Sequence, residues 1–162
     1  MLSSSEIFAL FAELSVGLIG FAGVAAAISG RDRKLTQLGQ FRLSGIVVLS
    51  TTVLAGCLAF FYVSSSGTGP QDSFRGAALT SLVFVLAYAG RTAPAALRTA
   101  RNAGSFSAAW AIYAGLISIA IQIGLLLMAA LQPTDPSAVI AAFSIQLLHA
   151  IWTFWRLLTL PS

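Results

Sequence analysis

Charged side chains are scarce in this sequence, and their scarcity excludes most soluble folds. Only 9% of its 162 residues are Asp, Glu, Lys or Arg, 57% are hydrophobic, and the mean hydropathy is +0.89. A soluble domain of this size usually carries about a quarter charged residues, which cover its water-facing surface. We therefore exclude a soluble globular monomer. The low charge also excludes a disordered chain.

Cysteine, histidine and lysine each occur once. With Cys57 as the single cysteine, no intrachain disulfide or cysteine metal cluster can form. With His149 as the single histidine, one chain cannot provide bis-histidine haem ligation or a metal site with several histidines. The single lysine, Lys34, lies between apolar runs, so no retinal Schiff base can form inside the membrane. The sequence also lacks the G-x-S-x-G motif that is typical of serine hydrolases. We expect no cofactor, no metal site and no enzymatic activity.

Long apolar runs are abundant. A helix that crosses about 30 Å of hydrocarbon needs about 20 apolar residues, and its backbone must satisfy its own hydrogen bonds. Five runs meet or approach that length, and they are rich in Ala, Leu and Gly without the alternation of barrel strands. The sequence therefore predicts an all-α, polytopic membrane bundle, one transmembrane domain over residues 1–162. Its expected spans are residues 7–28, 44–63, 76–90, 106–131 and 138–158.

Two of these spans leave alternatives open. The third is short, since 15 residues of helix rise only about 22 Å. Either Arg75 and Arg91 extend their charged ends to the interface, or the helix continues past Arg91 toward Pro94. The first span ends at Ala25-Ala26-Ala27, which is similar to a signal-peptide cleavage site, although no basic segment precedes it. Its removal would leave a bundle of four spans.

The basic residues predict the orientation. With alternating spans, eight of them fall on one side and only Arg75 on the other, so the positive-inside rule places the N-terminus outside and the C-terminus in the cytoplasm. We expect a bacterial cytoplasmic (inner) membrane. The pI near 10 then indicates lipid headgroups as partners and not nucleic acid. The residues expected at the headgroups are Arg31, Arg33, Lys34, Arg91, Arg98 and Arg101.

Glu13 is the one acidic residue inside an apolar run. An ionisable side chain in a spanning helix usually faces a protein interior, a partner or a water-filled cavity. Helical spacing puts Glu13 on one face with Gly17, Gly20 and Val24, small residues that let another helix approach closely. We therefore expect Glu13 to point into the bundle.

Polar residues recur at helical spacing in the fourth and fifth spans. Gly115, Ser118 and Gln122 share one face, and Gln146 and His149 share another. At about 1.5 Å per residue from the outer ends of the spans, Glu13 lies about 9 Å deep, Gln146 about 12 Å, Gln122 about 13 Å and His149 about 16 Å. The sequence thus predicts one polar layer formed by Glu13, Gln122, Gln146 and His149.

Three interpretations of this layer stay open: interhelical hydrogen bonds that hold the bundle, a proton or ion site, and an oligomer contact. In the second, Glu13 exchanges a proton and His149 is its relay partner. The segment Ala12-Glu13-Leu14 resembles, over these few residues only, the proton-coupled glutamate of small multidrug resistance transporters; those proteins have four spans and a glycine and aromatic pattern that is not found here.

The function that we hypothesise is a proton or small-ion conduit, working as an oligomer. The alternative is an accessory or assembly subunit that packs against itself or a larger membrane complex and transports nothing.

Overall fold

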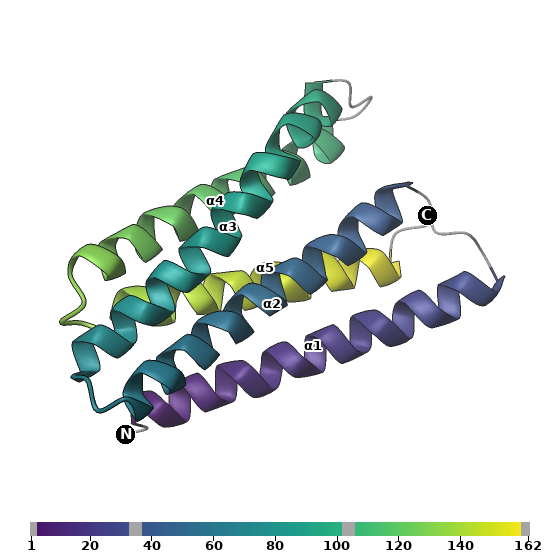
Figure 1. The fold of residues 1–162 in the computed structure, drawn as a ribbon. Helices are drawn as coiled ribbons and strands as arrows, with labels where there is room; N and C mark the ends of the chain where they lie inside the picture. The colour runs from purple at the N-terminus through teal and green to yellow at the C-terminus, as the bar shows by residue number, and fades with distance from the viewer. Residues whose placement is uncertain (1–2, 33–36, 102–105, 160–162) are drawn as a thin grey trace.

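The computed structural model describes residues 3–32, 37–101 and 106–159, and nearly all of them are helical (Figure 1). Five α-helices follow one another: α1 (Ser4–Asp32), α2 (Gln37–Ser65), α3 (Pro70–Arg101), α4 (Phe106–Leu131) and α5 (Ser137–Thr159). All five are long and apolar enough to cross a membrane. The predicted all-α membrane bundle is confirmed.

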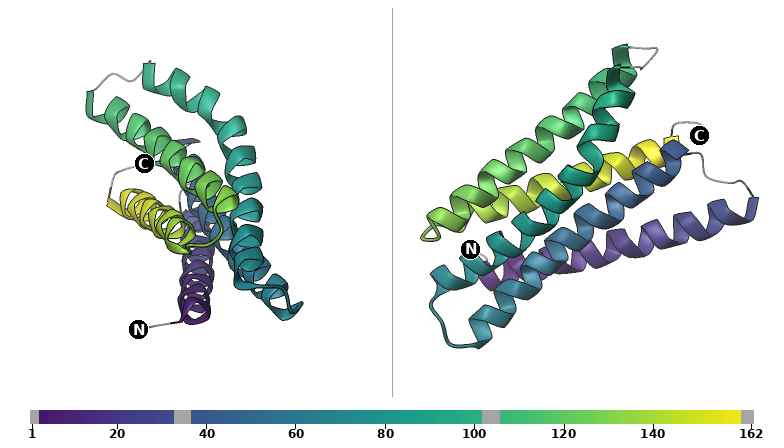
Figure 2. Two further views of the ribbon diagram at one scale, coloured as in Figure 1. Left: turned by 90° about the vertical axis from the view of Figure 1, so that its left-hand side faces the viewer. Right: turned by 45° about the horizontal axis from the view of Figure 1, so that its top comes forward.

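The third span differs from its predicted bounds. Helix α3 runs from Pro70 to Arg101 without interruption, so residues 76–90 are only its middle, and Pro94 lies inside it. Of the two alternatives for this short apolar run, continuation past Arg91 is the correct one. Proline removes one backbone hydrogen bond and bends a helix without necessarily ending it. Helix α3 is visibly curved (Figure 2).

Consecutive helices run in opposite directions, as the views in Figures 1 and 2 show. The start of α1, the α2–α3 turn and the α4–α5 turn lie at one end of the bundle, and the C-terminus lies at the other (Figure 1). Helix α2 packs against α1, α3 and α5, and α4 packs against α3 and α5. Helix α1 lies at the edge: among the described residues it packs mainly on α2 and touches α5 only slightly. It meets α3 through the rings of Phe8 and Phe74, whose centroids are 6.2 Å apart, and its backbone does not approach α4.

Phenylalanines hold four of the helices together near the N-terminal end of α1. The ring of Phe8 stacks on Phe60 of α2 with centroids 4.1 Å apart, and Phe60 stacks on Phe74 of α3 at 5.5 Å. Phe143 of α5 meets Phe8 edge-on at 5.7 Å. Phe8 and Phe143 are fully buried, so this cluster is the centre of the hydrophobic core.

Gly56 lets α2, α3 and α5 approach one another beside that cluster. A Cβ atom at this position would overlap Ser81 Oγ and the ring of Phe143. Both of these side chains are fully buried. Only glycine allows α2 to lie this close to its two neighbours.

Polar groups at the helix ends are used in capping and in joining helices. Ser3 and Glu6 form a capping box: the Ser3 backbone N–H donates to the Glu6 carboxylate at 2.6 Å, and the Glu6 N–H donates to Ser3 Oγ at 3.3 Å. Arg75 Nε of α3 donates to the backbone carbonyl of Ala130 at 3.0 Å, which satisfies a carbonyl at the end of α4.

The residues expected at lipid headgroups are only partly described. Arg91, Arg98 and Arg101 are exposed on the second half of α3. Arg33 and Lys34 lie outside the described residues, and so does the side chain of Arg31. At the same end as Arg101, Arg42 Nη1 donates to the backbone carbonyl of Arg156 at 3.2 Å and joins α2 to the end of α5.

Candidate functional site

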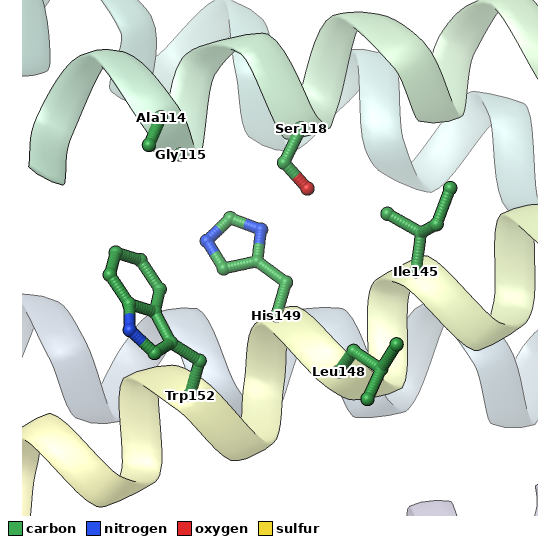
Figure 3. A pocket seen from close by; sticks show the side chains of 7 residues that line it. All are labelled: Ala114, Gly115, Ser118, Ile145, Leu148, His149 and Trp152. Carbon is green, nitrogen blue, oxygen red and sulfur yellow. The ribbon is translucent and has the colours of Figure 1, made fainter.

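The polar faces predicted for the fourth and fifth spans meet at the contact between α4 and α5. Figure 3 shows the His149 imidazole of α5 beneath α4, with the Ser118 hydroxyl pointing toward it. Gly115 lies directly beside this ring, since a Cβ atom there would be in ordinary van der Waals contact with His149 Nε2 at 3.6 Å. The ring of Trp152, one turn further along α5, lies 6.1 Å from the imidazole between centroids.

Gln122 extends this polar group into the interior. It lies one turn after Ser118 on α4, its side chain is fully buried, and its Nε2 donates to Ser118 Oγ at 3.1 Å. Its Oε1 has no hydrogen-bond partner among the described residues. The helix places Ser118 and Gln122 four residues apart on one face, so the bond needs no special backbone geometry.

Gln146 is fully buried on α5, near the middle of the span Ser137–Leu157. Neither its Oε1 nor its Nε2 has a hydrogen-bond partner within the described chain, and the same holds for His149 Nδ1. An unsatisfied buried polar group costs about 1–3 kcal/mol. Gln122, Gln146 and His149 therefore each carry a buried polar atom that a bound water, ion or ligand would stabilise.

Glu13 does not join this group, so the expectation that it points into the bundle is wrong. Its side chain is exposed, and α1 makes no contact with α4 in the described part of the chain. The reason is competition between two faces of α1. Phe8, Phe11 and Ser15 are buried against α2 and its neighbours, which turns the opposite face, with Glu13, outward.

The glycines that share this outward face have no partner either. A Cβ atom at Gly17, Gly20 or Gly23 would meet nothing within 4 Å among the described residues. Helix α1 is also the least buried of the five spans. The predicted four-residue layer is thus divided: His149, Gln122 and Gln146 lie at or behind the contact between α4 and α5, and Glu13 lies on a separate surface.

A cavity of about 300 Å³ lies between α4 and α5. Its walls come from both helices, as Figure 3 shows, and His149 and Ser118 supply its polar groups. Trp152, which the predicted polar layer did not include, lines it as well. Its position three residues after His149 is the signal that places both side chains on one face. Further lining residues are Gly115, Ile145 and Leu148.

Among the described residues, no group of three or more His, Cys, Asp or Glu side chains could hold a metal ion. No protein-family model matches this chain, and no curated protein or solved structure is significantly similar to it. The chemistry of the molecule must therefore be judged from its own residues.

Proposed function

We propose that this protein is a non-enzymatic integral membrane subunit that assembles through the outward face of α1. The observation that carries the proposal is the exposed carboxyl of Glu13 within the span Ser4–Ala27. Glu13 lies about 14 Å along a span about 36 Å long, so it is close to the middle of the hydrocarbon. A charged group at that depth costs about 3 kcal/mol on insertion scales unless it finds a partner.

The surroundings of Glu13 suit a second helix. Gly17 and Gly20 follow it along the same face, and each glycine inside a helix costs about 1 kcal/mol relative to alanine. Among the described residues, a Cβ atom at either glycine would meet nothing within 4 Å, so packing inside the chain does not require them. Small residues at this spacing let two membrane helices approach closely enough for van der Waals packing and interhelical hydrogen bonds.

The partner that we propose is a second copy of the chain. A two-fold axis beside α1 would bring the same residues of both copies together. The two Glu13 side chains would then lie within hydrogen-bonding reach of each other. Such a contact would remove both acids from lipid and bury the glycines of both helices at once.

Cysteine cross-linking in the membrane tests this proposal. We expect Gly20→Cys to form a disulfide-linked dimer on mild oxidation, because position 20 lies on the proposed contact. Val83→Cys is the matched control, since Val83 is 66% exposed on α3, away from α1. Cys57 can remain in both variants because it is fully buried. Equal cross-linking at positions 20 and 83 would show that α1 is not the contact.

Substitution of Glu13 separates a specific contact from random collisions. We expect Glu13→Leu in the Gly20→Cys background to reduce the cross-linked fraction several-fold. Glu13→Gln should preserve it, because an amide is both donor and acceptor. If Glu13→Leu cross-links as well as the parent variant, the carboxyl is not part of the interface.

A second candidate function, a path for protons or small ions, is favoured by the unsatisfied buried atoms of Gln122, Gln146 and His149. These side chains would hold water or an ion at mid-membrane depth. Proteoliposomes that contain the protein should then show a proton flux that Gln146→Leu abolishes, while Glu13→Gln leaves it unchanged. Absence of flux with the unsubstituted protein would refute this candidate.

We propose a cytoplasmic-membrane location with the N-terminus outside. The exposed Arg91, Arg98 and Arg101 would then contact anionic headgroups on the cytoplasmic side. Ser65 ends α2 at the opposite end of the bundle. We expect a cysteine at position 65 to react with an impermeant thiol reagent added outside intact cells, and one at position 98 to react only after permeabilisation. The reverse pattern would invert the topology.

A further inference from the structure

We propose that the cavity between α4 and α5 binds a membrane-dissolved quinone by its ring. The site lies near the middle of both spans: His149 is in the central part of Ser137–Leu157, and Ser118 is within Ile112–Leu131. Phospholipid headgroups stay at the interface, and lipid-exposed polar groups are unfavourable at this depth. A ligand must therefore arrive from the hydrocarbon and be largely apolar.

The walls of the cavity show where such a molecule would enter. Leu148 and Trp152 line the cavity and are also exposed on the outer surface of α5, at 65% and 40%. Ile117 and Ile121 are exposed on the adjoining surface of α4, at 53% and 50%. The opening is thus surrounded by side chains that face lipid, and an isoprenoid tail could remain in the bilayer while the ring enters.

The volume is suitable for a substituted ring. The space between α4 and α5 is about 300 Å³, which leaves room for ring substituents and the first part of a tail. The Trp152 indole and the His149 imidazole give this space planar, aromatic walls on one side (Figure 3). Flat aromatic walls favour a flat ligand through stacking or edge-to-face contact.

Two hydrogen-bonding groups match the oxygens of a quinone. Ser118 Oγ accepts a hydrogen bond from Gln122 Nε2, which orients the hydroxyl and leaves its proton available for donation. The imidazole of His149 can donate from one nitrogen and accept at the other, and its buried Nδ1 has no partner in the described chain. A quinone carbonyl would accept from either group, and the hydroxyl of a quinol could donate to the imidazole.

Tryptophan fluorescence tests binding directly, because quinones quench nearby indoles. The probe is decylubiquinone, added to the full-length protein in liposomes. The variant Trp110→Phe/Trp155→Phe keeps Trp152, which lines the cavity, as its only tryptophan. We expect saturable quenching of Trp152 in this variant. A linear, collisional decrease would overturn the proposal.

Two glycines of α4 provide a matched pair of substitutions. In the variant with Trp152 alone, Gly115→Leu should weaken quinone binding at least about tenfold, because its side chain would fill the cavity. Gly124→Leu should leave binding unchanged, since position 124 is exposed and has open space beside it. Equal binding by these two variants would show that the quinone is not in this cavity.

His149→Phe keeps a planar ring and provides an independent test if Gly115→Leu does not fold. Loss of one hydrogen bond should weaken binding by about fivefold. Unchanged binding would overturn the role assigned to the imidazole. Decanol, which carries a comparable tail and a hydroxyl but no ring, should fail to relieve the quenching at equal concentration. Relief by decanol would show that the site recognises an alkyl alcohol and not a quinone.

Discussion

Alanine at position 56 should destabilise the bundle, although alanine is the better helix former. Gly56 lies in the buried part of α2, where a Cβ atom would overlap Ser81 Oγ of α3 and the ring of Phe143 of α5. The Ser81 hydroxyl lies 3.4 Å from the Thr52 backbone carbonyl, to which it donates a hydrogen bond. The ring of Phe143 meets Phe11 edge-on at 5.8 Å and Phe8 at 5.7 Å. Neither side chain can move without disturbing another contact.

The expected magnitude is the difference between two terms. Replacement of glycine by alanine in a helix gains up to about 1 kcal/mol of helix propensity. Overpacking of a tightly packed core costs about 1–3 kcal/mol, and the overlap here involves two fully buried groups from two helices. We therefore expect Gly56→Ala to lower the free energy of unfolding by about 1–2 kcal/mol.

Titration of the protein with SDS in mixed micelles, followed by circular dichroism, measures this free energy. The matched control is Gly124→Ala on α4, where a Cβ atom would meet nothing within 4 Å. This control should be neutral or slightly stabilising. If Gly56→Ala unfolds at the same SDS fraction as the control, the close contact of α2 with α3 and α5 is wrong.

A second substitution tests whether overlap with Phe143 causes the destabilisation by Gly56→Ala. Phe143→Leu removes the ring atoms that a Cβ atom at position 56 would meet. In the double variant with Gly56→Ala, the two destabilisations should sum to less than their separate values, because residues in contact are energetically coupled. Strict additivity would refute the overlap with Phe143.

Three further predictions concern the connections between helices. Gly67 has a φ of +77°, so Gly67→Ala should lower the free energy of unfolding in the SDS titration by about 1 kcal/mol, whereas Gly69→Ala, with a negative φ and open space, should not. Arg75→Met removes the hydrogen bond to Ala130 and should increase amide hydrogen exchange at the end of α4; exchange confined to α3 would contradict this. Hydrogen bonds from the backbone N–H and the hydroxyl of Ser137 lower the pKa of Asp135. The Asp135 carboxylate therefore stabilises the start of α5 at neutral pH. This contribution to stability is lost as the pH falls below about 4 and through the lowered pKa. Asp135→Asn should remove that part of the pH dependence, and an unchanged acid profile would contradict the assignment.

The membrane-spanning segments could be predicted because hydropathy is local in the sequence. Each apolar run must satisfy its own backbone hydrogen bonds in hydrocarbon, whatever its neighbours do, and five runs gave five helices. Helix α3 was the exception, because it begins before the predicted residue 76 and ends after the predicted residue 90. Arg91 and Pro94 are typical of a boundary, but the helix continues through both to Arg101 because one missing N–H bends a helix more readily than it ends it.

The candidate site could be predicted in part. Regular spacing placed Ser118 with Gln122 and Gln146 with His149. Ser118 and His149 both line the cavity between α4 and α5, and Gln122 donates a hydrogen bond to Ser118. Sequence reasoning had no means of measuring the cavity beside His149, because its volume depends on how far two helix axes are separated. It also did not predict that a Cβ atom at position 56 would overlap Ser81 and Phe143.

Glu13 shows most clearly what could not be predicted from the sequence alone. Its depth and its glycine-rich face were visible in the sequence, and so was the alternative face with Phe8 and Phe11. The phenylalanines of α2, α3 and α5 decide which of the two faces turns inward. Burial of the aromatic face against Phe60, Phe74 and Phe143 stabilises the bundle more than packing of the glycine-rich face against another helix would. The chain's own order of residues thus decides how many helices form and where the middle of each lies, because each apolar segment is stabilised by the surrounding hydrocarbon. The direction in which each helix faces is decided in three dimensions, because it results from competition among side chains of several helices at once.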